Sequence, residues 1–148
     1  MKQLLATIIL AVSLAALPAC STKAPDLGMA NGMFAVCPDD VDCISSQADD
    51  AKHKIAPITA SGDPNKVMVD LSNAIESIFG AKVILSEGNY LRAEFRSSVL
   101  RTIDDAEFFY DEQAGLIHIH ALSRGEALNF PDSRKRIEEV RVKFAELQ

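Results

Sequence analysis

The stretch Tyr90-Leu91-Arg92-Ala93-Glu94-Phe95-Arg96, which Ser97 follows, alternates polar and apolar side chains one by one. Successive side chains of a β-strand point to opposite faces of the sheet, so this pattern predicts a strand with one buried and one solvated face. Antiparallel sheets commonly keep one face in water. The stretch therefore favours an antiparallel sheet.

Further strands are predicted on either side of this stretch, and Ile117, Ile119 and Ala121 alternate with His118 and His120 in the same way. The predicted ranges are 82–85, 89–97, 102–110 and 116–122. Turn signals occur at Glu87-Gly88-Asn89 and at Asp111-Glu112-Gln113-Ala114-Gly115. Because short turns join consecutive strands, the segment predicts an antiparallel meander. Residues 53–58 are extended and limited by Pro57, and they fit either an edge strand or a structured loop.

Two helices flank this meander. Asp63 followed by Pro64 is a strong helix start, and Gly80 is a typical stop. Asp132 can cap a second helix. Apolar stripes at helical spacing comprise Val67, Leu71, Ala74, Ile75 and Ile78 in the first helix, and Ile137, Val140, Phe144 and Leu147 in the second. The sequence predicts an α+β fold: an antiparallel sheet of four to five strands with two helices packed on one face, a two-layer sandwich.

The N-terminus has the layout of a secretory signal. Lys2 precedes an apolar run that is too short to span a bilayer, and Leu17-Pro18-Ala19-Cys20 follows it. These residues resemble a bacterial lipobox, which implies cleavage after residue 19 and attachment of palmitate and other acyl chains to Cys20. Membrane lipid is then one partner, and Ser21 favours the outer membrane. The alternative is an ordinary cleavable signal in which Cys20 is incidental.

Composition limits the domain organisation and the partners. We expect a signal peptide at residues 1–19, a flexible tether at 20–34 and a single α+β domain at 35–148. The net charge of -6 argues against a nucleic-acid partner. The absence of tryptophan weakens any case for a sugar-stacking site.

The cysteines are Cys20, Cys37 and Cys43. If Cys20 carries lipid, the other two form an even pair in an oxidising compartment, and we expect a disulfide between them. A metal pair is the first alternative, but no second Cys or His pair stands at zinc-site spacing. A redox pair is the second, although the spacing is wider than Cys-x-x-Cys.

The solvated face of the predicted sheet is unusually polar. Its residues are Arg92, Glu94, Arg96, Asp105, Glu107, His118 and His120, with Arg124 beyond the last strand. They fit either a structural ladder of cross-strand ion pairs or a site for a small polar or anionic ligand. His118, His120 and Glu107 are weak candidates for a metal site, and solvated strand positions are the alternative. No cofactor is expected.

Arg134-Lys135-Arg136 places three cations at the start of the second helix, where the helix dipole is positive. Asp104, Asp105 or Glu107 could pair with them, or an anion could bind there. A solvated helix end is the alternative. Ser45, Ser46 and His53 are of the types used in catalysis, but no known catalytic motif surrounds them.

Several motifs together resemble the family called domain of unknown function 1499, which is common in bacterial envelopes and plastids. They are Cys43-Ile-Ser-Ser-Gln47, His53-x-Ile-x-Pro57, Asn89-Tyr-Leu-Arg-Ala-Glu94, Ile103-Asp-Asp-Ala-Glu-Phe108, Ser123-Arg124 and Arg134-Lys-Arg-Ile-Glu138. The resemblance implies a small domain of undetermined function. The polar family residues that this chain retains are Asp104, Asp105, Glu107, Arg124, Arg134 and Arg136, which we take as the candidate ligand-binding residues.

The loop at residues 125–133 departs from the family pattern. Glu126, Asn129, Pro131 and Ser133 stand where such proteins usually have a glycine, an aspartate, a second glycine and an asparagine. The sequence thus leads to a non-catalytic, membrane-tethered envelope lipoprotein that binds a small ligand or an envelope protein. The alternatives are an uncharacterised, hydrolase-like periplasmic enzyme and a purely structural envelope component.

Overall fold

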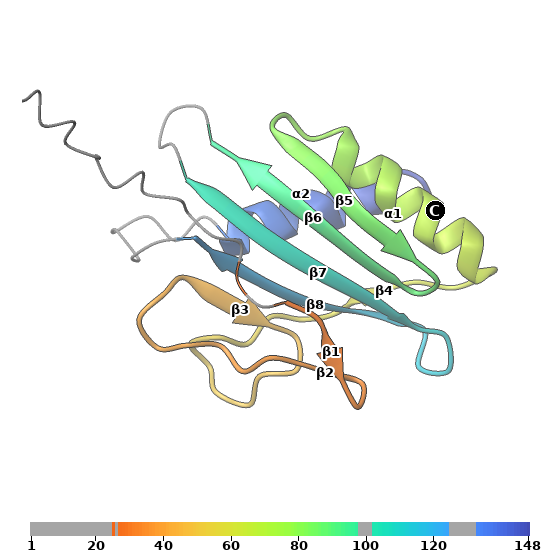
Figure 1. Ribbon diagram of the computed structural model, residues 1–148. Helices are drawn as coiled ribbons and strands as arrows, with labels where there is room; N and C mark the ends of the chain where they lie inside the picture. Colours follow the sequence, from red (N-terminus) through yellow and green to blue (C-terminus); the bar gives the residue numbers. More distant parts are fainter. Residues whose placement is uncertain (1–24, 26, 98–101, 125–132) are drawn as a thin grey trace, which may run out of the picture.

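Four long strands follow one another through the middle of the chain and pair antiparallel with their neighbours (Figure 1). The computed structural model describes residues 25, 27–97, 102–124 and 133–148. The main sheet contains β3 (Cys43–Ser45), β4 (Ile58–Thr59), β5 (Ala81–Glu87), β6 (Tyr90–Arg96), β7 (Ile103–Asp111) and β8 (Leu116–Ser123). Its order is β3-β8-β7-β6-β5, and β4 also pairs with β8. The short strands β1 (Met29–Ala30) and β2 (Met33–Phe34) form a separate hairpin.

The helices are α1 (Pro64–Glu76) and α2 (Ser133–Ala145), and both cover the same face of the sheet (Figure 1). In β6, the apolar residues of the alternation are fully buried against them. Leu91 lies opposite Phe108, which lies opposite Ile119, so the core continues across three strands. Asp63 caps α1 by accepting a hydrogen bond from the backbone N–H of Lys66 at 3.1 Å. The predicted helix start and the apolar face of the meander are thus confirmed.

The prediction of four to five strands is wrong, because the main sheet has six in the described part of the chain. The additional strands β3 and β4 contain only three and two residues, too few to show an alternation, and only their bonds to β8 define them. Leu147 was also misplaced in the apolar stripe, since α2 ends at Ala145 and Leu147 is 43% exposed. The predicted cap Asp132 and most of the 125–133 loop lie outside the described residues.

The prediction of a solvated second face fails on β7 and β8. Asp105, Glu107 and His120 are at most 1% exposed. Glu107 and His120 are covered in part by residues 28–34, which the sequence assigned to a flexible tether. The β1–β2 hairpin lies beside the sheet (Figure 1), and the ring of Phe34 stacks on His120 with centroids 5.7 Å apart. The second face of the sheet is therefore partly covered, and the residues expected in the tether belong to the fold.

Neither helix in the described part of the chain combines the length and the apolar character needed to cross a bilayer. The predicted signal peptide at residues 1–19 and the predicted acylation site Cys20 lie outside the described residues.

Candidate functional site

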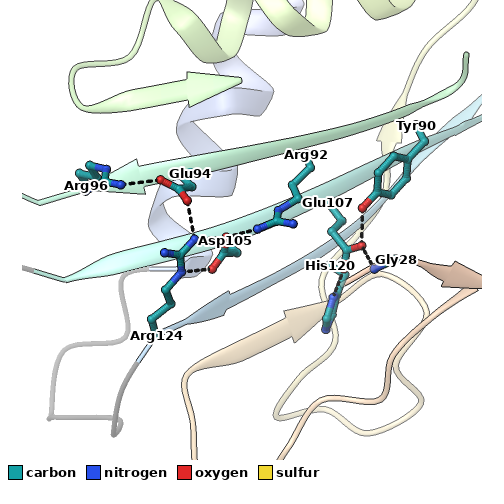
Figure 2. Close-up of polar contacts among 9 residues, drawn as sticks. All are labelled: Gly28, Tyr90, Arg92, Glu94, Arg96, Asp105, Glu107, His120 and Arg124. Carbon is teal, nitrogen blue, oxygen red and sulfur yellow. Dashed lines mark hydrogen bonds and ion pairs between the residues drawn. The ribbon is translucent and has the colours of Figure 1, made fainter. Parts of the chain in front are cut away.

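An arginine network occupies one end of the sheet face that points away from the helices (Figure 2). Arg124, just beyond β8, donates two hydrogen bonds to Asp105 at 2.6 and 2.7 Å and one to Glu94 at 2.5 Å. Arg96 donates to Glu94 at 2.8 Å, and Arg92 lies 3.5 Å from Asp105. Three guanidinium groups thus share two carboxylates, and the bidentate clamp of Arg124 is occupied by the protein's own Asp105.

The pKa values agree with this pairing. Burial acts to raise the pKa of Glu94, but hydrogen bonds from Arg124 and Arg96 outweigh it and lower that pKa below its usual value. The hydrogen bond to Asp105 raises the pKa of Arg124 despite burial. The pairing therefore stabilises the charged forms of Glu94 and Arg124.

A second cluster surrounds Glu107 on the same face (Figure 2). One carboxylate oxygen accepts hydrogen bonds from the Tyr90 hydroxyl and the Gly28 backbone N–H, each at 2.6 Å. The other oxygen lies 2.8 Å from Nδ1 of His120. Burial, followed by the hydrogen bond to Glu107, raises the pKa of Tyr90, which keeps its hydroxyl protonated as a donor. Glu107 is thus held from three sides by groups that act as donors to a carboxylate.

His120 connects Glu107 to the cysteine pair. Its Nε2 lies 3.5 Å from Sγ of Cys43. Cys43 is bonded to Cys37, so the predicted disulfide is present, with Cα atoms 5.5 Å apart. Register explains the contact, because Ser45 and Cys43 on β3 lie opposite His120 and Leu122 on β8 and their side chains share one face. Glu107, His120 and Cys43 therefore form one buried line.

A cavity of about 350 Å³ opens beside the disulfide and is lined by residues 33–37, 45 and 47–50. Its apolar lining includes Met33, Phe34, Val36 and Ala48. Val36 is 91% exposed and Met33 is 52% exposed, so both offer apolar surface to solvent. Asp49 and Asp50 also line it. Cys37 also lines the cavity.

The candidate ligand-binding residues do not converge on one site. Asp105 and Arg124 meet in the arginine network, and Glu107 belongs to the neighbouring cluster. Asp104 is on the helix face, where it forms an ion pair with Arg136 at 2.5 Å. Arg134 donates to the backbone carbonyl oxygens of Lys52 and Lys54 at 3.4 and 2.9 Å.

Among the cations at the start of α2, Arg136 pairs with Asp104, which is one of the predicted carboxylate partners. Asp104 also accepts a hydrogen bond from the Ser123 hydroxyl. Burial raises the pKa of Asp104, although Ser123 and Arg136 act to lower it. An internal carboxylate thus compensates one cation at this helix start.

The two histidines on β8 have separate partners. His118 Nδ1 lies 3.3 Å from the Ser46 hydroxyl, whereas His120 faces Glu107 and Cys43. Within the described residues, the group with metal-ligating atoms close together is Cys37, Cys43 and His120, and its two sulfurs are bonded to one another. His53 pairs with Asp50 at 3.0 Å, and that hydrogen bond lowers the pKa of Asp50.

Sequence reasoning missed Gly28, Phe34 and Tyr90 as members of the site. Gly28 and Phe34 fell within the expected tether, and Tyr90 counted only as a polar position of a strand. The contact between Cys43 and His120 joins residues 77 positions apart. Only the pairing of β3 with β8 brings them together.

Comparison with known proteins gives one result. No curated protein and no solved structure matches the chain. The family model described as "Protein of unknown function (DUF1499)" matches residues 33–144. This range includes the cysteine pair, Glu107, His120 and the whole arginine network. Since the match covers most of the chain and agrees with the motifs quoted above, the protein belongs to the DUF1499 family.

Proposed function

We propose that this chain is a bacterial cell-envelope lipoprotein, acylated on Cys20 and anchored in the outer membrane facing the periplasm. The lipobox-like residues and the apolar segment before them support this proposal. The disulfide fits it, because such bonds persist in oxidising compartments. More than one acyl chain on Cys20 would give stable anchoring.

The described domain acts in this proposal as a non-catalytic binding domain, and its binding site is the cavity beside Cys37. This assignment rests on a volume of about 350 Å³ with an apolar lining, which is in the range of ligand sites. The cavity lining contains Asp49 and Asp50 and no lysine or arginine. Charge complementarity therefore favours a partner polypeptide that inserts an apolar side chain flanked by positive charge.

In this proposal the arginine network is a structural ladder of ion pairs and not a site for an anionic ligand. A ligand carboxylate or phosphate would have to displace Asp105 from Arg124, leaving a fully buried carboxylate without its partner. Binding an anion at Arg124 therefore costs more free energy than binding it at an exposed arginine that has no buried partner to displace.

Mass spectrometry of protein extracted from native membranes tests the anchor. The expected mature mass begins at Cys20 and includes acyl chains, and a Cys20→Ser variant is expected in the soluble envelope fraction. A mature mass without acyl chains overturns this part of the proposal.

Chemical-shift mapping by NMR tests the cavity, with a short alternating lysine–leucine peptide as probe and a glutamate–leucine peptide as control. The lysine–leucine peptide is expected to shift the resonances of Met33, Val36 and Ala48. The double variant Met33→Ser/Val36→Ser is expected to lose this response, whereas Val142→Ser keeps it, because Val142 is an exposed apolar residue of α2 outside the cavity lining. Equal responses to both peptides contradict the proposed site.

A further inference from the structure

The two sulfurs of the disulfide have different surroundings. Cys43 is 3% exposed and belongs to β3 at the edge of the sheet. Cys37 is partly exposed and lines the cavity. An external thiol that enters the cavity therefore reaches Cys37 and not Cys43.

The buried sulfur also has a histidine beside it. Nε2 of His120 lies 3.5 Å from Sγ of Cys43, while Nδ1 is directed at Glu107. A sulfur within a disulfide is only a weak hydrogen-bond acceptor, so this contact contributes little while the bond is intact. A cysteine thiolate, by contrast, is strongly favoured next to a protonated imidazole. Nε2 of His120 is therefore placed where it can interact with a thiolate on Cys43 once the disulfide opens.

Glu107 and Phe34 hold His120 in this orientation. Tyr90 and Gly28 donate to one oxygen of Glu107, which leaves the other oxygen for Nδ1 of His120. The Phe34 ring stacks on the imidazole, and the two planes are 18° apart. A histidine oriented by a carboxylate and aimed at a sulfur is the arrangement that activates cysteine nucleophiles elsewhere.

We propose that the Cys37–Cys43 disulfide is a thiol–disulfide exchange centre, with Cys37 as the attacked sulfur and Cys43 as the leaving group. The thiolate of an incoming thiol forms a new bond to Sγ of Cys37. The Cys37–Cys43 bond breaks, and its electron pair remains on Cys43. The proton released by the incoming thiol is balanced by one taken up by the Cys43–His120 pair.

A second thiol of the same partner then displaces Cys37. The partner leaves oxidised to a disulfide, and this chain retains two thiols, so two electrons and two protons are transferred. The substrate class is a dithiol polypeptide. Its access through the cavity rests on the proposed binding function, whereas the exchange chemistry itself needs only a thiol that reaches Cys37.

Reaction of the oxidised domain with glutathione tests the exchange chemistry. After the reaction is stopped with an alkylating agent, peptide mapping by mass spectrometry is expected to find glutathione on Cys37 and the alkyl group on Cys43. Glutathione attached to Cys43 overturns the proposal.

The role of His120 is tested with His120→Asn, because the asparagine amide can still donate toward Glu107 but has no group near Cys43. Reduction by glutathione at neutral pH is expected to slow by about tenfold, since a leaving thiol of higher pKa leaves more slowly. His118→Asn, two residues away on the same face, is the control and is expected to keep the wild-type rate. Equal rates in folded His120→Asn and His118→Asn overturn the role of His120.

Two single-cysteine variants keep the proposal testable if His120→Asn does not fold. Cys43→Ser leaves Cys37 in the cavity and is expected to form a mixed disulfide with oxidised glutathione much faster than Cys37→Ser, in which Cys43 remains buried. The reverse order overturns the proposal.

Peptides separate this inference from the proposed binding function. A cysteine-containing lysine–leucine peptide is expected to react with Cys37 faster than a cysteine-containing glutamate–leucine peptide. Equal peptide rates contradict the cavity as a binding site, while a glutathione adduct on Cys37 still supports the exchange centre.

Discussion

Arg124 holds Asp105 through two hydrogen bonds of 2.6 and 2.7 Å, and the side chain of Asp105 is fully buried in the described structure. The two residues lie 19 positions apart, on β7 and just beyond β8. A buried ion pair of this kind is costly to break from one side, because the remaining charge stays without a partner. This relationship makes Arg124 the residue on which the arginine network depends.

Arg124→Ala is therefore expected to lower the free energy of unfolding by about 3–5 kcal/mol. Arg124→Lys keeps the charge but not the bidentate geometry, so its loss is expected to be smaller. Urea unfolding followed by circular dichroism measures both. The control is Arg96→Ala, because Arg96 is 62% exposed and its pair with Glu94 is expected to contribute at most about 1 kcal/mol. A loss for Arg124→Ala no greater than for Arg96→Ala contradicts this role.

Tyr90→Phe removes one donor to Glu107 and keeps the aromatic ring. We expect a loss of about 1–3 kcal/mol, since a buried carboxylate loses one of its hydrogen bonds. A double-mutant cycle with Glu107→Gln isolates the interaction, and Tyr90→Phe is expected to cost less in the Glu107→Gln background. Additive effects of the two substitutions would show that they are not coupled.

Glu94 makes the stability depend on pH in the acid range. Its pKa is lowered in the folded state, because the hydrogen bonds from Arg124 and Arg96 outweigh burial. A lowered pKa contributes stability above the unfolded-state value of about 4.3, and this contribution is lost as the pH falls through the folded-state pKa. Glu94→Gln is expected to lose less stability than the wild type between about pH 6 and about pH 3 in urea titrations.

Asp104→Asn serves as a control of opposite sign. Burial raises the pKa of Asp104, so its contribution is lost as the pH rises through that value. In the wild type, protonation of Asp104 on acidification adds stability that offsets part of the loss from other groups. Asp104→Asn lacks this gain, so its loss of stability toward low pH is expected to be steeper than in the wild type. If the free energy of unfolding depends on pH in the same way in the wild type, Glu94→Gln and Asp104→Asn, the opposite pKa shifts of Glu94 and Asp104 are contradicted.

Gly80 cannot accept a side chain where α1 leads into β5. Its φ is +81°, and an added Cβ would meet the backbone oxygen of Arg96 at a distance no Cβ adopts. Gly80→Ala is expected to cost more than the about 1–2 kcal/mol of the left-handed backbone alone. Gly88→Ala is the matched control, because Gly88 has φ +55° but no atom within 4 Å of the added Cβ. Thermal unfolding of both variants measures the difference, and equal losses contradict a steric cause.

Local patterns were enough to predict the elements that carry the core. Alternation in residues 90–96 is a property of a single strand, and the cap at Asp63 depends on residues within one helical turn. Both were found from neighbouring residues alone. Strand β3 was missed because it is too short to show a period, and β4 overlaps the segment 53–58, which the sequence left open as an edge strand or a loop, only at Ile58. Both strands exist only through bonds to β8.

The sequence was a weaker guide to which residues contact one another in the site and which of them are buried. Alternation correctly placed Asp105, Glu107 and His120 on the face away from the helices. The burial of Glu107 and His120 involves residues 28–34, which have no apolar period and therefore resemble a tether in the sequence. Asp104 was grouped with Asp105 as a ligand candidate, but successive strand residues point to opposite faces, and only the α2 contact showed that Asp104 pairs with Arg136.

The sequence by itself determined the order of the two helices and the four long strands and the buried face of the meander, and it favoured a bond between Cys37 and Cys43, because periodicity, capping and cysteine count are local or compositional properties. Tertiary structure alone decided that Arg124 clamps Asp105 and that His120 stands between Glu107 and Cys43. Those contacts depend on strand register and on which distant segment covers the sheet, and neither leaves a signal in neighbouring residues.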